Sequence, residues 1–411
     1  MLRDIALTLA AAAPVAGDRD PGVTGTGVAC SLVLRLRDGV VLAVTAERHG
    51  TTQLQWAIEL QVSVDVLGAV GALCYPALVG EAAPGDAVTL NTMAIELGLG
   101  TGGQALVVHV AGRSPRPDGD AGTRRVVKAR YTPHQVSVQG VDDNGSPHRA
   151  AIARAARDGL CGMPVVAADL HSALPAVVAG VHADAPALRV AYLMTDGGSL
   201  PLAYSRTVAE LGGRLCGTVT VGQAYGGDLE AVTVHSGLLA CRAVLEADVV
   251  VVAPGPGSTG TGTTWGFSGV AAGEVLNAAA VLEGRPVACL RVSGVDARDR
   301  HHGVSHHSLT AYGRVALVTA DVAVPTGLPG ALDRVVAAGV APLRERHRLV
   351  AVNTGGLAAA LAAIDADLTG GLRTMGRGYT EDPAPFLTAA AAGRHAAGLT
   401  KVSTPGPSPS T

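Results

Sequence analysis

Acidic residues and histidines follow several short apolar runs in the middle of this 411-residue chain. The runs cover residues 164–170, 188–195 and 216–222, and the polar residues at or just after their ends are Asp169, His171, Asp196, Asp228 and Glu230. Carboxylates and imidazoles together suit zinc, manganese or iron, and they also donate and accept protons. All five are therefore candidates for acid/base catalysis, and Asp169, His171, Asp196 and Asp228 are also candidate ligands of a divalent metal.

A second group of candidates consists of histidines. His301, His302, His306 and His307 lie within one short segment, and such a cluster suits metal binding, proton transfer or contact with phosphate. His306 and His307 are the stronger catalytic candidates, because SHHSLTAYG runs into an apolar segment. His301 and His302 follow the charged sequence ARDR, which is typical of a solvated loop. His235 is a further candidate acid/base residue.

The stretch VVVVAPGPGSTGTGTTWGFSG, residues 249–269, passes from a β-branched run through a loop of small residues toward a helical segment. Backbone N–H groups and hydroxyls at such a joint can surround an anion or cofactor. The candidate binding residues are Gly255, Gly257, Ser258, Thr259, Gly260, Thr261, Gly262 and Thr263. The loop lacks the lysine of a P-loop and the G-x-G-x-x-G spacing of a dinucleotide site, so a merely tight strand–helix connection is the alternative. Lys128, Arg130 and Arg377 are candidate sources of positive charge for the same ligand.

Each of these side chains also has a purely structural interpretation. An aspartate just past a strand often caps the next helix, and a single histidine near a helix start is often a hydrogen-bonded core residue. No serine lies in a G-x-S-x-G motif, so the sequence gives no support to a serine-hydrolase mechanism. The six cysteines are scattered without a CxxC pair, which favours reduced, buried thiols over a zinc knuckle.

The alternation of apolar runs and helical periods predicts the fold. Short β-branched runs from about residue 32 to 110 predict a small β-rich, barrel-like domain. Further along, apolar runs alternate with amphipathic helices, which is typical of repeated βαβ units. We therefore expect an α/β protein with a Rossmann-like parallel sheet and helices on both of its faces. Because ligands bind at the carboxyl ends of strands in such a sheet, the candidate residues should share one rim.

The predicted boundaries are an N-terminal extension at 1–30, the β-rich domain at 31–112, a polar linker at 111–124, the α/β domain at 125–399 and a disordered tail at 400–411. Three segments of the α/β domain carry specific expectations. Residues 229–247 should form one helix, residues 314–324 a strand, and residues 372–399 a further strand, glycine-rich cap and helix.

Composition narrows the function. Hydrophobic residues make up 48% of the chain, charged residues 16%, and the net charge is -3, with no basic face. We expect no nucleic-acid partner, and no membrane span because no apolar run reaches about 18 residues. A cytoplasmic location is the default expectation, and a homo-oligomer is compatible with the composition.

Several long strings resemble a bacterial family of uncharacterised function, the DUF3866 proteins. They include NTMAIELGLGTGG, KARYTPHQ, GMPVVAADLHSALPAVVAG, GPGSTGTGTTWGFSGVAAGE, VSHHSLTAYGRVAL and TMGRGYTEDPAPFLTAAAAGRHAA. The resemblance runs from about Leu34 to Gly398, although the segment from Glu47 to Cys74 is atypical for the family's opening strands. The resemblance implies no particular activity.

The expected function is that of an enzyme acting on a small anionic metabolite, phosphorylated or carboxylated, at the carboxyl-end rim of the sheet. A divalent-metal-dependent hydrolase is its most specific version. The alternative is a non-catalytic nucleotide- or metabolite-binding protein, or an accessory protein that has lost its chemistry. Convergence of carboxylates and imidazoles on one point favours the enzyme, whereas convergence of backbone amides and hydroxyls alone favours binding.

Overall fold

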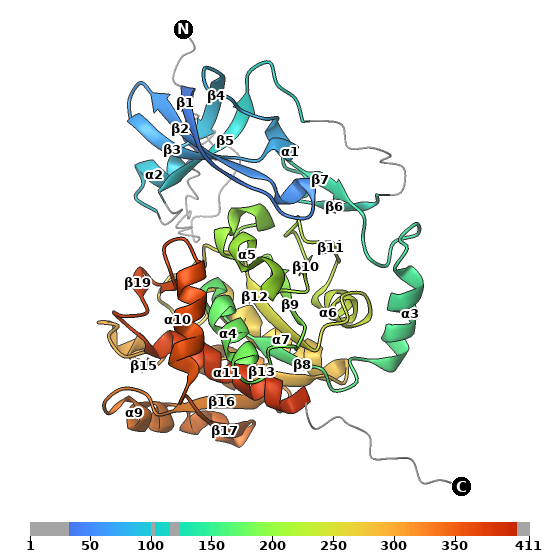
Figure 1. Cartoon of the computed structure of the whole chain (residues 1–411), viewed down its shortest axis with the longest axis vertical. Helices are drawn as coiled ribbons and strands as arrows, with labels where there is room; N and C mark the ends of the chain where they lie inside the picture. The colour runs from blue at the N-terminus through green and yellow to red at the C-terminus, as the bar shows by residue number, and fades with distance from the viewer. Residues whose placement is uncertain (1–32, 100–102, 116–123, 401–411) are drawn as a thin grey trace, which may run out of the picture. The chain divides into compact units, whose positions relative to one another are not determined.

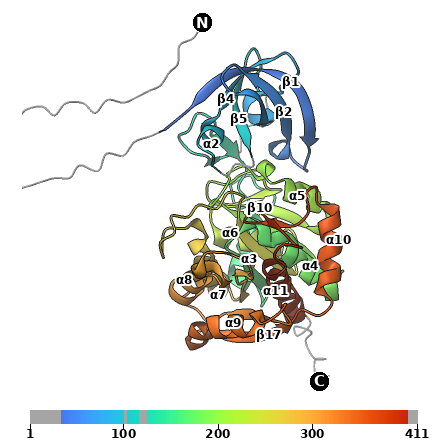
Figure 2. The ribbon, with the colours of Figure 1, turned by 90° about the vertical axis from the view of Figure 1, so that its left-hand side faces the viewer.

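The computed structural model describes residues 33–99, 103–115 and 124–400 (Figures 1 and 2). The predicted extension, most of the predicted linker and the tail after Thr400 lie outside these residues. The chain divides into two compact units. The first unit consists of the described residues up to Glu47 and those from Ala57 to residue 115. The second unit consists of Arg48–Trp56 and the described residues from 124 onward.

The first unit is a closed five-stranded barrel with the strand order β1-β2-β3-β5-β4. Its strands are β1 (Leu36–Arg48), β2 (Ala57–Val64), β3 (Gly68–Cys74), β4 (Ala87–Asn91) and β5 (Gln104–Val110), with short helices α1 (Pro76–Val79) and α2 (Met93–Glu96). Along β5 the buried side chains alternate with more exposed ones, as a small barrel requires. The prediction of a β-rich, barrel-like first domain is confirmed.

The second unit is built on an eight-stranded, all-parallel sheet with the order β11-β10-β9-β12-β8-β13-β16-β17. Its strands are β8 (Pro164–Ala167), β9 (Val190–Thr195), β10 (Gly217–Thr220), β11 (Leu229–Glu230), β12 (Val249–Pro254), β13 (Arg285–Ala288), β16 (Asp321–Thr326) and β17 (Arg348–Asn353). Every residue of β8 and β12 is buried, because helices cover both faces. The predicted parallel sheet is therefore confirmed.

The helices of this unit form two groups on opposite faces of the sheet (Figure 1). Their bounds are α3 (Arg149–Asp158), α4 (Leu174–Asp184), α5 (Arg206–Leu211), α6 (Val234–Ala243), α7 (Ala272–Val281), α8 (His306–Thr310), α9 (Leu332–Gly339), α10 (Leu357–Asp367) and α11 (Ala384–Thr400). Helices α4, α10 and α11 pack together on one face, and on the other face α6 contacts both α3 and α7. No helix in the described part of the chain is long and apolar enough to cross a membrane.

Three local expectations need correction. The segment 229–247 is not one helix, because Leu229 and Glu230 add a strand to the sheet edge before α6 begins. The segment 314–324 begins in a π-helical turn that ends at Val315, and its strand starts only at Asp321. The segment 372–399 contributes no strand to the main sheet, since its first part folds into a separate hairpin.

Within the described residues, three small hairpins lie outside the barrel and the main sheet. They are formed by β6 (Val126–Lys128) with β7 (Val136–Val138), β14 (Val292–Ser293) with β15 (Gly303–Val304), and β18 (Arg373–Thr374) with β19 (Arg377–Gly378). In the β14–β15 hairpin, His301 and His302 lie in the loop between the two strands, and His306 and His307 follow the second strand.

Helices α4 and α11 approach each other through two glycines. A Cβ atom added at Gly180 of α4 would overlap the carbonyl oxygen of Ala390, and one at Gly393 of α11 would overlap that of Val177. Backbone contact of this kind needs residues without a side chain at both crossing points. The alanines around Gly393 are buried, so α11 presents a flat surface to its neighbour.

This contact gives a prediction with an internal control. Gly393→Ala should destabilise the protein by about 1–3 kcal/mol, because the added methyl group forces two backbones apart. Gly398→Ala in the same helix should be neutral or stabilising by up to about 1 kcal/mol, since its Cβ would meet no atom within 4 Å. Urea unfolding of both variants measures the difference, and equal stabilities would contradict this account of the interface.

Candidate functional site

The candidate site lies where the order of the sheet reverses. From β8 the chain crosses to β9 on one side, whereas from β12 it crosses to β13 on the other side of β8. In an open parallel sheet, such a reversal opens a crevice at the carboxyl ends of the strands. Asp169 follows β8, Phe267 lies in the loop after β12, and Arg291 follows β13, so three neighbouring strands contribute to one group of side chains.

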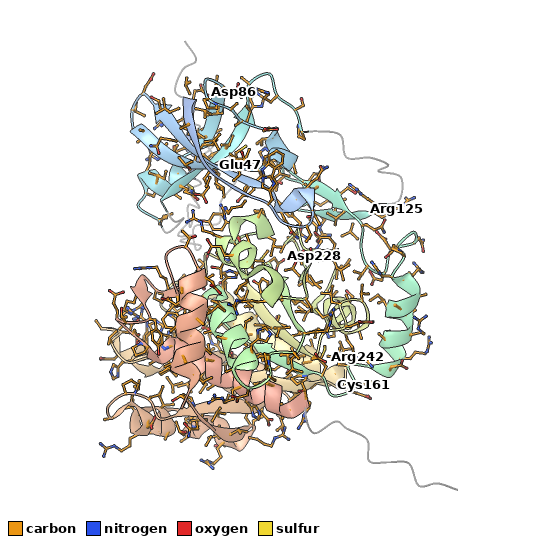
Figure 3. All side chains as sticks on the ribbon, viewed as in Figure 1. Glu47, Asp86, Arg125, Cys161, Asp228 and Arg242 are labelled. Carbon is orange, nitrogen blue, oxygen red and sulfur yellow. The ribbon has the colours of Figure 1, made fainter. Side chains whose placement is uncertain are left out.

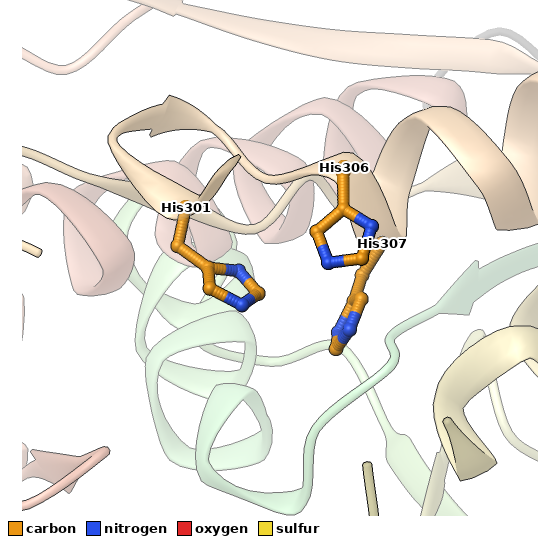
Figure 4. A group of neighbouring side chains, drawn as sticks. All are labelled: His301, His306 and His307. Atoms are coloured by element: carbon orange, nitrogen blue, oxygen red, sulfur yellow. The ribbon is translucent and has the colours of Figure 1, made fainter. Parts of the chain in front are cut away.

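Three histidine rings form the centre of this group and face a common space (Figure 4). His301 ends a 3-10 turn, and His306 and His307 begin α8. The ring centroids lie 4.4 to 5.0 Å apart, and one nitrogen of each ring lies within 4.8 Å of the others. Among the residues that the structure describes, no other group of three or more His, Cys, Asp or Glu side chains has this spacing.

The sequence pointed to His306 and His307 but placed His301 and His302 in a solvated loop. His302 is indeed exposed, whereas His301 is 4% exposed. The β14–β15 hairpin turns the segment inward at His301, and Ser305, the N-cap of α8, lies 2.8 Å from the His301 Nδ1. This inward turn depends on a short antiparallel pairing that the polar sequence ARDRHH does not reveal.

Two neighbours fix the ring of His307. Phe267 stacks on it with the ring centroids 3.7 Å apart and the planes nearly parallel. Arg291 Nη1 lies 3.0 Å from His307 Nδ1, and because a guanidinium only donates, this nitrogen accepts and the proton of the neutral ring sits on Nε2. Asp169 Oδ2 is 3.8 Å from the same Nδ1 and 3.9 Å from Arg291 Nη1, too far for a hydrogen bond to either.

Two buried polar atoms beside the cluster have no hydrogen-bond partner in the described structure: Oδ2 of Asp169 and Nε2 of His306. Such atoms are uncommon in folded proteins, where nearly all buried polar groups are paired. The loop after β12 presses close to Asp169, since a Cβ added at Gly269 would lie 2.8 Å from the Asp169 backbone oxygen. Asp169 is thereby held against the cluster by packing, while one of its carboxylate oxygens stays unpaired.

Burial and arginine charge keep the three imidazoles neutral. Burial lowers the pKa of His307 to about 3 and that of His301 to about 4, with Arg291 as the next cause in both. Burial also lowers the pKa of His306, and it raises the pKa of the Asp169 carboxyl against the opposing effect of Arg291. At neutral pH the cluster therefore presents unprotonated ring nitrogens.

His171 does not join this cluster. Its Nδ1 lies 3.0 Å from the Tyr192 hydroxyl and its Nε2 lies 2.7 Å from Ser205 Oγ. It lines a separate cleft of about 460 Å³ between the start of α4, the start of α5, the loop at Gly255–Ser258 and the segment at 368–375. No sequence pattern indicated Ser205, which is 34 residues from His171 and has the sequence context of a simple helix cap.

The glycine-rich loop after β12 divides into two parts. Gly255, Gly257 and Ser258 line the cleft beside His171. From Thr259 onward the loop is exposed and bonds to itself through its own hydroxyls and amides, in a small antiparallel turn. The predicted residues Thr259, Gly260, Thr261, Gly262 and Thr263 thus lie away from the cleft wall, and anion binding by the loop stays a prediction for its first part.

Two predicted site residues are structural. Lys128, proposed as a source of positive charge for a ligand, is completely buried, and its Nζ lies 2.9 Å from the carbonyl oxygens of both Ala224 and Ala231. It also lies 3.4 Å from Glu230 Oε2, and Glu230 in turn accepts from Thr220 and from the backbone of Gly226. The buried pair ties β6 to the edge of the sheet, because an ammonium removed from water must be fully paired.

The remaining predicted acidic residues also lie apart from the histidines. Asp196 is exposed and accepts the Gln223 backbone N–H. Asp228, labelled in Figure 3, accepts from the backbone and hydroxyl of Thr218 and from Thr51. Asp169, His171, Asp196 and Asp228 therefore do not form a four-ligand metal centre, because three of them have separate partners.

The other three candidates, Arg377, Arg130 and His235, also lie outside the group of three histidines. Arg377 lines a small pocket with Asp169 and His301, where its charge is balanced by Asp296 and Asp382 at 3.3 and 3.6 Å. Arg130 is exposed and its backbone N–H donates to Gln223. His235, the second residue of α6, is exposed as well.

Comparison with known proteins assigns the family. The model of a family described as a protein of unknown function, DUF3866, matches residues 71–393. The chain belongs to the DUF3866 family. The match begins within β3, so β1 and β2 lie outside it. The segment Glu47–Cys74, which looked atypical, therefore lies outside the match except for its last four residues. No curated protein and no solved structure matches this DUF3866 chain.

The lowered pKa values predict how stability depends on pH. Histidine in the unfolded chain titrates near pH 6.5, so below that pH the unfolded state binds protons that the folded cluster refuses, and stability falls as the pH falls. His307→Gln should lose less unfolding free energy than the wild type when the pH is lowered from 7 to 4.5. The difference between the two proteins should grow by about 1.4 kcal/mol for each pH unit below 6.5. Urea unfolding with a chelator present measures it.

The matched control is the exposed neighbour His302. His302→Gln removes a histidine from the same segment at an exposed position outside the cluster. If His307→Gln and His302→Gln show the same slope as the wild type, the cluster does not hold neutral imidazoles.

Proposed function

We propose that this DUF3866 protein is a metal-dependent enzyme that acts on a small anionic metabolite, with hydrolysis as the reaction. The observation that supports it most is the group His301, His306 and His307, three neutral imidazoles with nitrogens within 4.8 Å of one another. Beside them, His306 Nε2 and Asp169 Oδ2 are buried without partners. The proposal moves the metal away from the acidic residues that the sequence suggested.

Neutral nitrogens are what a divalent ion requires, because a protonated imidazole cannot be a ligand. Three histidines suit zinc or another first-row ion and leave a coordination position for water or substrate. A metal there would polarise a carbonyl or phosphoryl oxygen and lower the pKa of its bound water. The low histidine pKa values mean that the protein has already excluded the competing protons at neutral pH.

Asp169 has a defined part in this proposal. When His307 Nε2 serves as a ligand, the ring proton must move to Nδ1, and Arg291 must give up its bond there. Asp169 Oδ2, 3.8 Å from that Nδ1, is the nearby acceptor for the proton-bearing nitrogen. A carboxylate that orients a metal-bound histidine raises the basicity of the ligand. Asp169 is therefore assigned as the orienting partner of His307.

The surrounding charge favours an anionic substrate. Arg291 and Arg300 both lower histidine pKa values in the cluster, so their positive field reaches its interior. Arg298 also lowers the pKa of His301 and His306, although Asp296 binds its guanidinium at 2.8 and 2.9 Å. Once released from His307, the Arg291 guanidinium can pair with a carboxylate or phosphate through two parallel hydrogen bonds.

Metal binding is the first test. After chelator treatment and dialysis against Zn²⁺ or Mn²⁺, the wild-type protein should retain a divalent ion, and His306→Ala should lose it. His302→Ala, a variant of the exposed neighbour, should retain the ion. Elemental analysis measures the content, and equal metal content in all three proteins would defeat the proposed ligand set.

The role of Asp169 has its own test. Asp169→Asn should weaken metal affinity about 10- to 100-fold, as the loss of an orienting carboxylate does elsewhere. Titration calorimetry with Zn²⁺ measures this change. The same preparations, assayed against a panel of phosphate monoesters and carboxylate esters, should show hydrolysis that depends on the ion and on Asp169. Metal affinity unchanged by Asp169→Asn would contradict the orienting role.

A second candidate is a non-catalytic sensor of an anionic metabolite, and the bond from Arg291 to His307 favours it. In that case arginine and histidine N–H groups would hold the anion without a metal. Arg291→Met separates the two candidates: a sensor loses phosphate binding in chelator-treated protein, whereas the metal centre keeps or gains affinity for Zn²⁺ because His307 is released.

A further inference from the structure

A chain of hydrogen bonds leads from the His171 cleft into the protein core. Ser205 Oγ lies 2.7 Å from His171 Nε2, and His171 Nδ1 lies 3.0 Å from the hydroxyl of Tyr192. The Tyr192 hydroxyl is 3.1 Å from the carbonyl oxygen of Pro254 and 3.3 Å from that of Ala253. Tyr192 is fully buried, so the chain has one end in the core and the other at the cleft.

The direction of the protons along this chain follows from its ends. Carbonyl oxygens only accept, so the Tyr192 hydroxyl donates to Pro254 and accepts from His171 Nδ1–H. The neutral imidazole then has its lone pair on Nε2, which accepts the hydroxyl proton of Ser205. Burial lowers the pKa of His171 to about 4, so the ring is neutral at physiological pH. This is the tautomer that a serine nucleophile requires of its base.

Ser205 is also the N-cap of α5, where its Oγ accepts the Val208 N–H. The cap explains a serine at this position but not the bond to His171, since capping leaves the hydroxyl proton free to point elsewhere. Ser205 lines the cleft of about 460 Å³ together with Gly257 and Ser258. The N–H groups of these two loop residues donate to no acceptor among the described residues, and they are available to a substrate oxygen.

We propose that Ser205 is a nucleophile for acyl transfer, activated by His171, and that the cleft accepts a carboxylic ester of a small acid. Ser205 Oγ attacks the ester carbonyl carbon while its proton passes to His171 Nε2. The carbonyl C–O bond to the alcohol then breaks, and the alcohol leaves with the proton from His171. Water attacks the acyl-serine by the reverse proton route and releases the acid.

Tyr192, the third residue of the chain of hydrogen bonds, determines how reactive Ser205 is expected to be. A tyrosine hydroxyl orients the imidazole, but it is neutral and stabilises an imidazolium less than a carboxylate does. We therefore expect reactivity toward activated acyl and phosphonyl groups. The chemistry requires no metal, so this inference and the proposed metal enzyme stand or fall independently.

The test uses the full-length protein treated with a chelator and then with a fluorophosphonate probe, followed by peptide mapping by mass spectrometry. The probe should attach to Ser205, and p-nitrophenyl acetate should leave an acetyl group on the same residue. His171→Gln should slow both reactions about 100-fold, the usual contribution of a general base. Ser205→Asn should abolish them while preserving the helix cap, because asparagine caps as well as serine.

Ser172 provides the matched control. It lines the same cleft, but its hydroxyl lies 2.8 Å from Thr374 Oγ1 and has no histidine partner. In the wild-type protein Ser172 should stay unlabelled, because its hydroxyl has Thr374 and not a histidine as its partner. Absence of labelling in folded wild-type protein, attachment at another residue, or a rate unaffected by His171→Gln would each overturn the proposal, with circular dichroism confirming that every variant is folded.

Discussion

The backbone contact between α4 and α11 is the constraint on which both candidate centres depend. Gly180 and Gly393 bring the two helices together over the sheet, so the segments that precede them also become neighbours. The segment before α4 carries Asp169 and His171 from β8. The segment before α11 supplies residues 368–375 to the wall of the cleft. A wider helix crossing would separate these walls while leaving the sheet itself intact.

The sheet was predictable because its signal is local and repeated. The strands β8, β9 and β12, which are buried on both faces, are short apolar runs, and their alternation with helices favours parallel pairing. The position of the site followed from this order, since Asp169 and His307 belong to segments that had to reach the same rim. The strand β11 was not predictable, because it has only two residues and two residues show no alternation of buried and exposed side chains.

The partners of individual polar residues were not predictable in the same way. In the sequence, Lys128 and Asp228 look like ligand-binding residues. In the structure, Lys128 donates to two carbonyl oxygens about 100 residues along the chain, and Asp228 accepts from the amide and hydroxyl of Thr218 on the neighbouring strand. Ser205 is the opposite case: its sequence context is that of a helix cap, and only the tertiary fold adds His171. Whether a polar side chain is saturated is decided by long-range contacts, so spacing alone cannot separate structural from reactive residues.

The two centres use the same physical effect for different ends. Burial makes His171 and the histidine cluster neutral alike, but what lies behind the rings differs. Behind the cluster stands Asp169, whose charge can compensate a cation bound to the nitrogens. Behind His171 stands the neutral Tyr192, which offers no such compensation and fixes only the tautomer. This difference agrees with the two proposals: a cation at the cluster would have a carboxylate to compensate its charge. At His171 only a proton, passing from a neutral hydroxyl to a departing alcohol, would be held.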